Sequence, residues 1–191
     1  MHVPTRARQL TLAAGLTLAA GSAFAHPGDH AIAGFAAGFA HPFSGIDHLL
    51  AMLAVGLFAA RHNGRARWAL PAAFLVAALA GVAWAGVGRG LPGLETGLAL
   101  SVLLFGLLLA TRTGGLATGA ALTAGFAVFH GYAHGVELAA STSVAPALVG
   151  FVLASASLHL VGLAIGSTAR RLVPLTGAGI AATGAALLLI A

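Results

Sequence analysis

Two short segments of the sequence place imidazole and carboxylate groups in apolar surroundings. The first reads His-Pro-Phe-Ser-Gly-Ile-Asp-His from residue 41 to residue 48. The second carries His130, His134 and Glu137, whose i, i+4, i+7 spacing aligns side chains along one face of a helix. Imidazole and carboxylate without thiolate are ligands suited to borderline divalent metals such as Ni²⁺, Co²⁺, Zn²⁺ and Cu²⁺. These residue types therefore indicate a site for a divalent cation.

The candidate ligands fall at depths where polar groups are costly. An ionisable side chain at the centre of a bilayer costs about 3 kcal/mol or more unless it is paired, hydrated or bound to an ion. On a continuous first helix, His41, His48 and Met52 would share one stripe. We expect His41, His48, His130 and His159 near the membrane midplane, with His134 and Glu137 closer to the outer face. The principal candidates are His41, Asp47, His48, His130, His134 and Glu137; the additional ones are His26, His30, Met52 and His159.

The composition excludes an ordinary soluble domain. The chain is 59% hydrophobic and 7% charged, with a mean hydropathy of +0.99, whereas soluble domains contain about 25% charged residues. Cysteine is absent, which removes disulfides, thiolate metal sites and cysteine nucleophiles. The net charge of +5 comes from arginines scattered between apolar runs. This scatter indicates topology signals and not a nucleic-acid surface.

The N-terminus has the three parts of a secretory signal. Two arginines precede an apolar stretch over residues 10–20, and Ala-Phe-Ala follows at 23–25. We expect a signal peptide over residues 1–25 and a mature membrane domain over residues 26–191; an uncleaved first helix is the alternative. Cleavage would make His26 the first residue, and its ring and free amine, with His30 nearby, would form a metal-capturing tail outside the cytoplasm.

The mature chain divides into six apolar segments, each long enough to cross a bilayer core of about 30 Å. We predict an all-α integral membrane protein, a bundle of six transmembrane helices after a cleaved signal peptide, with the first helix broken at His41-Pro42. Pro42 removes a backbone hydrogen bond and Gly45 loosens the next turn. Backbone carbonyls freed in this way are tolerated at membrane depth only beside protein or a watery cavity, as at a substrate site. The segments are residues 31–60, 68–87, 93–110, 116–135, 146–168 and 174–191.

The arginines predict the orientation of these segments. With the mature N-terminus outside, three loops face the cytoplasm, and they hold most of the positive charge of the mature chain, while the outer loops hold Arg89 alone. This asymmetry follows the rule that positive residues stay inside. The arginines of the inner loops are Arg61, Arg65, Arg67, Arg112, Arg170 and Arg171.

Both polar segments resemble motifs of a known family. Residues 41–48, continuing to Met52, Val55, Gly56 and Leu57, resemble the signature of the HupE/UreJ family, and the run from His130 to Glu137 resembles its second motif. The resemblance covers the whole chain. It implies a secondary permease for nickel, with cobalt as a second candidate, that supplies hydrogenase or urease maturation. By this resemblance His41, Asp47 and His48 would bind metal on the first helix, and His130, His134 and Glu137 on the fourth.

We therefore expect an importer of Ni²⁺, or Co²⁺, in the bacterial inner membrane, multi-pass, with a periplasmic mature N-terminus. We expect no enzymatic activity, no resident cofactor beyond the transported ion and no nucleic-acid partner. The expected partners are the metal ion, the lipid bilayer and hydrogenase or urease maturation proteins; the oligomeric state stays open. An intramembrane zinc-dependent hydrolase, with Glu137 or Asp47 as general base, is the enzymatic alternative. A haem-binding electron carrier with paired histidine ligands is a third.

Overall fold

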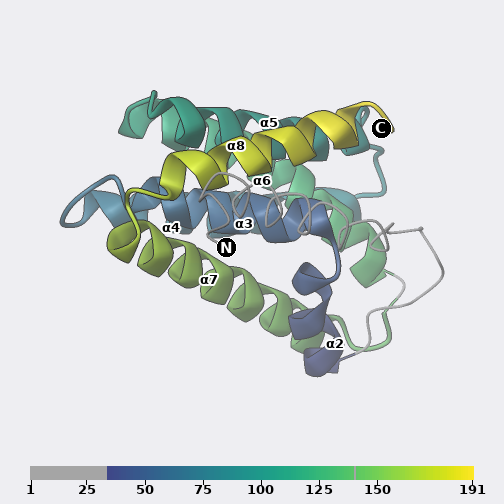
Figure 1. Cartoon of the computed structure of the whole chain (residues 1–191). Coiled ribbons are helices and arrows are strands. Elements are labelled where there is room, and N and C mark those ends of the chain that lie inside the picture. The colour runs from purple at the N-terminus through teal and green to yellow at the C-terminus, as the bar shows by residue number, and fades with distance from the viewer. Residues whose placement is uncertain (1–33, 140) are drawn as a thin grey trace, which may run out of the picture.

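The computed structural model describes residues 34–139 and 141–191, which are helical throughout apart from short connections (Figure 1). The predicted signal peptide, His26 and His30 lie outside the described residues. The prediction of an all-α chain is confirmed for the part described. Its elements are α2 (Gly34–Ala40), η2, a short 3₁₀ helix (His41–Phe43), α3 (Ile46–Ala59), α4 (Ala66–Gly86), α5 (Leu94–Thr111), α6 (Leu116–Ala139), α7 (Val144–Thr168) and α8 (Val173–Leu188).

Several of these helices can cross a membrane. By length and apolarity, α4, α5 and α7 each qualify, and α2–η2 together with α3 qualify as one broken span. The 24 residues of α6 include histidines, glycines and a glutamate that lower its hydropathy, and α8 has only 16 residues. Large apolar side chains such as Val76 and Val87, each 70% exposed, cover the outer surface. The chain is therefore a multi-pass membrane protein with three to four candidate spans among the described residues.

The first helix breaks where its sequence predicts. Pro42 lies in η2 and has no N–H to continue the helix. Gly45 then takes an extended conformation, with φ −92° and ψ 120°, and α3 begins at the next residue. The two parts meet at an angle of 78°. The expected stripe of His41, His48 and Met52 is wrong, because this bend places His41 on a different axis from the other two.

Glycines set the distances between paired helices. The most extensive pairs are α4 with α6 and α5 with α8, while α2 and α3 both pack on α7; in Figure 1, α2 stands across one end of α7. Gly106 of α5 lies against the backbone of Ala181, and Gly184 of α8 lies against the backbone of Leu103. A Cβ at either position would overlap the facing main chain. Backbones at this separation gain van der Waals contact, which is the main attraction between helices in lipid.

This packing predicts opposite effects for two substitutions within α8. Gly184→Ala forces α5 and α8 apart and should cost about 1–3 kcal/mol. A Cβ added at Gly179 would meet no heavy atom within 4 Å, so Gly179→Ala should be neutral or stabilise the helix by up to about 1 kcal/mol. Thermal unfolding of the purified variants in detergent compares them. A Gly184→Ala midpoint equal to that of Gly179→Ala would contradict the close approach.

Candidate metal centre

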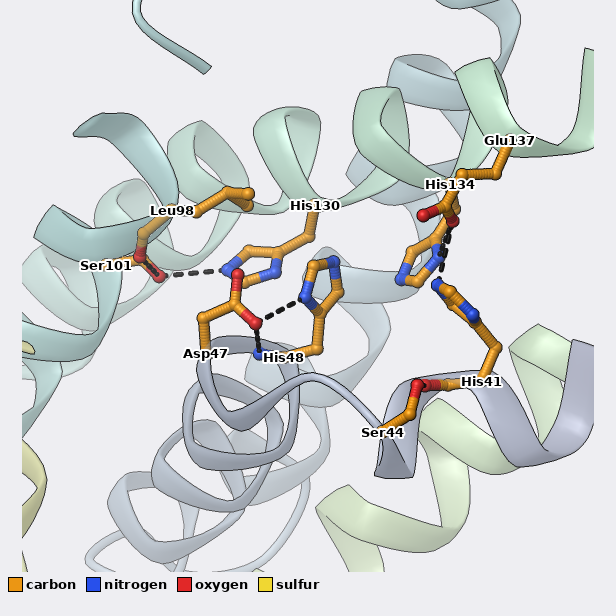
Figure 2. Close-up of polar contacts among 9 residues, drawn as sticks. All are labelled: His41, Ser44, Asp47, His48, Leu98, Ser101, His130, His134 and Glu137. Atoms are coloured by element: carbon orange, nitrogen blue, oxygen red, sulfur yellow. Dashed lines mark hydrogen bonds and ion pairs between the residues drawn. The ribbon is translucent and has the colours of Figure 1, made fainter. Parts of the chain in front are cut away.

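Three elements bring the six principal candidates together at one place in the bundle (Figure 2). The 3₁₀ helix η2 supplies His41, the first turn of α3 supplies Asp47 and His48, and the C-terminal half of α6 supplies the rest. The imidazole rings form a continuous series. Ring centroids lie 4.9 Å apart for His41 and His134, 4.4 Å for His134 and His48, and 4.7 Å for His48 and His130.

The more exposed end of this series is the group of His41, His134 and Glu137. Nε2 of His41 lies 2.8 Å from Oε2 of Glu137, and Nδ1 of His134 lies 3.4 Å from the same oxygen. Their ligand atoms all lie within 4.8 Å of one another, a spacing found for no other such group in the described part of the chain. The side chains of His41 and Glu137 are 28% and 41% exposed, but that of His134 is 2% exposed. The group therefore joins the surface to the interior.

This grouping corrects one expectation about the neighbours of His41. His41 was expected near the midplane beside His48 and His130, but it lies with the more exposed Glu137. The cause is the break at Pro42, since a straight helix would carry His41 and His48 along a common line. The pairing of His134 with Glu137 agrees with their spacing of three residues on α6.

Asp47 orients the imidazole of its sequence neighbour. Its Oδ1 accepts a hydrogen bond from the backbone N–H of His48 at 2.8 Å, and it lies 2.8 Å from Nδ1 of the His48 ring. A carboxylate is an acceptor, so Nδ1 carries the proton. The remaining nitrogen, Nε2, then presents a lone pair. A carboxylate behind a histidine in this way is the usual support for a metal-binding imidazole.

Ser101 of α5 does the same for His130, although neither polar segment of the sequence contains it. Its hydroxyl donates to the carbonyl oxygen of Leu98 at 2.6 Å, and its Oγ lies 2.9 Å from Nε2 of His130. Since the hydroxyl proton is already donated to Leu98, Oγ accepts a hydrogen bond from the Nε2–H of His130 and leaves Nδ1 as the free nitrogen. A fully buried serine on an apolar helix was the available signal, but its partner lies 29 residues away on another helix.

The free nitrogens are suited to a metal. Nε2 of His48, Nδ1 of His130 and Nε2 of His134 are buried and have no hydrogen-bond partner among the described residues. Leaving a buried polar atom unpaired costs about 1–3 kcal/mol. All three are imidazole nitrogens, a ligand type suited to a borderline divalent cation, and an oxygen lies beside the other nitrogen of each ring. They do not meet the 4.8 Å spacing, which among the described residues only the group of His41, His134 and Glu137 has.

The remaining candidates lie outside this series. His159 of α7 is 1% exposed, and its ring packs edge-on against Phe74 with centroids 4.8 Å apart. Phe74 also contacts the ring of His130, at 5.8 Å, so it lies between the two histidines. Met52 is fully buried in the main apolar core. Neither side chain belongs to the group of His41, His134 and Glu137.

The helices and the buried cluster define a multi-pass α-helical membrane protein with a candidate site for a divalent metal. The family model described as HupE / UreJ protein matches residues 14–187. The chain belongs to the HupE/UreJ family, as its motifs predict. Protein HupE of Rhizobium leguminosarum bv. viciae is 39% identical over 172 residues, which cover 87% of this chain and 90% of that protein. No solved structure matches the chain.

The role of Ser101 can be tested with a second serine as control. Ser101→Ala removes the acceptor that holds Nε2 of His130, so the ring should exchange tautomers and bind metal about 10–100-fold more weakly. Ser157 is exposed, and its hydroxyl donates only to the carbonyl oxygen of Leu153, so Ser157→Ala should bind as wild type. Co²⁺ titration measures the affinity, and ¹⁵N NMR of the histidine ring nitrogens reports the tautomer. An unchanged tautomer in Ser101→Ala would contradict the assignment.

Proposed function

We propose that this protein imports Ni²⁺, and Co²⁺ by the same ligand chemistry, across the bacterial inner membrane as a secondary permease. The observation that carries the proposal is the unbroken series of imidazoles from the half-buried His41 to the fully buried His130. Membership of the HupE/UreJ family supports a metal ion as the substrate. It also supports hydrogenase or urease maturation as the destination of the metal, with maturation proteins as partners.

The proposed topology has six spans after a cleaved signal peptide. The 24 residues of α6 extend about 36 Å at 1.5 Å per residue, enough to cross the bilayer core. Its histidines and the glycine beside each of them, Gly131 and Gly135, are buried within the bundle. The 16 residues of α8 reach about 24 Å, which a locally thinner bilayer accommodates at modest cost.

The two ends of the bundle support an inward direction. The arginines of all three proposed inner loops meet at one end, where Arg61, Arg112, Arg170 and Arg171 line a common cavity. The helix α6 starts at that end and finishes beside Glu137 at the other. Positive loops stay in the cytoplasm, so His41 and Glu137 would face the periplasm.

The series of rings offers a stepwise route for the ion. We infer capture by His41, His134 and Glu137 at the periplasmic end. The His134 ring also contacts His48, so exchange of ligands there would pass the ion inward without leaving it bare in apolar surroundings. His48, held by Asp47, and His130, held by Ser101, would form the deeper site.

The transport proposal is tested by metal content. Cells that express wild type, His48→Ala or His62→Ala receive trace Ni²⁺, Co²⁺, Zn²⁺ and Cu²⁺ together. His62 lies in the α3–α4 loop, outside the cluster, and serves as the matched histidine control. Wild-type and His62→Ala cells should accumulate nickel or cobalt selectively. Accumulation in His48→Ala cells should be at least about ten-fold lower, because removal of a direct ligand weakens metal binding at least as much as removal of a residue that supports a ligand.

Two results would contradict it. Equal uptake by His48→Ala and wild type would remove the deeper site from the route. Zinc that stays bound through extensive dialysis, together with peptide or ester hydrolysis, would favour the hydrolase instead. The hydroxyls of Ser44 and Ser157 already donate to the backbone carbonyls of His41 and Leu153.

Substitutions in the capture group and in the deeper site should change different kinetic parameters of uptake. Glu137→Gln weakens the exposed capture group, so half-saturation should move to about ten-fold higher nickel with a smaller change in the maximal rate. Asp47→Asn keeps an acceptor for His48 but removes the charge behind the deeper site, so the maximal rate should fall. Initial uptake rates of ⁶³Ni²⁺ over a range of concentrations measure both. The same change in both variants would contradict separate steps.

A further inference from the structure

A basic cavity lies at the end of the bundle opposite the metal cluster. It has a volume of about 460 Å³ and is formed where α3, α5 and α7 end and α8 begins. Its walls combine apolar side chains with four arginines contributed by three separate loops. The lining residues that matter here are Leu57, Leu109, Val173, Arg61, Arg112, Arg170 and Arg171.

The positive charge of this cavity has no acidic counterpart. The acidic residues in the described part of the chain are Asp47, Glu95 and Glu137, and none of them lines it. Arg61 is anchored, because it donates to the carbonyl oxygens of Thr113 and Arg112, each at 2.6 Å, and lies over the ring of Phe58. Burial, and then the Arg112 guanidinium, lower the pKa of Arg61. The cationic side chains therefore repel one another, and no acidic side chain among the described residues that line the cavity offsets their charge.

Arg112 occupies a backbone conformation that favours glycine. With φ 55° and ψ 24° at the C-cap of α5, it is the single non-glycine residue with positive φ among those described. Glycine is the common residue at such helix ends because it has no Cβ to strain. An arginine retained in this conformation indicates that its side chain has a use there. At the neighbouring helix, α8 begins at Val173 with no side chain capping its N-terminus.

We propose that this cavity binds a phosphate-bearing anion, supplied by the headgroup of an anionic phospholipid or by phosphate in the cytoplasm. Guanidinium groups match phosphate geometry and remain charged at any physiological pH. Basic pockets between transmembrane helices on the cytoplasmic side are suited to anionic headgroups, and the apolar walls would contact the first carbons of the chains. The proposal needs membrane insertion but does not depend on metal transport.

Two double substitutions of arginine distinguish an anion-binding site from arginines that only set the orientation in the membrane. Arg170→Gln/Arg171→Gln removes two cavity charges. Arg65→Gln/Arg67→Gln removes two charges at the start of α4 without touching the cavity, since neither residue lines it and Arg67 lies over Trp68. Native mass spectrometry of the full chain in detergent, titrated with phosphatidylglycerol, phosphatidylcholine or sodium phosphate, gives the affinities. The first pair should weaken binding of the preferred probe at least about ten-fold, and the second should leave it unchanged.

A third variant tests whether weaker anion binding is separate from loss of the folded structure. Arg112→Gly relieves the strained backbone, so it should unfold at a higher temperature than wild type yet bind the anion more weakly. Preference for phosphatidylglycerol over phosphatidylcholine would identify a lipid headgroup, and binding of sodium phosphate alone would identify free phosphate; either supports the site. Equal losses in both arginine pairs, binding of neither anion above phosphatidylcholine, or wild-type affinity in Arg112→Gly would overturn it.

Discussion

Polar atoms between apolar helices need partners that lipid does not supply, and this requirement organises the interior of the protein. Asp47 holds His48, Ser101 holds His130, and Glu137 lies beside both His41 and His134. Each arrangement pairs one ring nitrogen with an oxygen and leaves the other free. The imidazoles of this cluster are thus oriented at a tolerable cost while they keep electron pairs available for an ion.

Small residues make this polar interior compatible with tight packing. On α6, His130 and His134 are each followed by a glycine, and a residue one position later points about 100° away around the helix. Gly131 and Gly135 lie against the backbone of α4, so one face of α6 packs on that helix while the adjacent face carries the histidines. A larger residue at Gly131 would overlap Ala78 and would move both rings with the helix.

The sequence predicted the features that depend on local chemistry. Pro42 and Gly45 identified the break, apolar runs identified the helices, and the spacing of His134 and Glu137 placed both on one side of α6. Features that depend on how helices meet were not predictable in this way. The position of His41 beside Glu137 follows from a bend of 78°, and the contact between Ser101 and His130 requires α5 and α6 to approach. Neither the bend angle nor the approach of two helices can be predicted from the residue spacing within a single segment.

The number of carboxylates in the cluster has a consequence for the charge of the ion that it could bind. Asp47 and Glu137 carry two negative charges between them when ionised, and the histidines that bind a metal are neutral. An ion of charge two would make the whole assembly electroneutral, whereas a sodium ion or a trivalent ion would leave a net charge buried in a medium of low dielectric constant, at high cost. If the cluster holds an ion, this charge balance would favour a divalent ion before ligand geometry distinguishes one divalent metal from another.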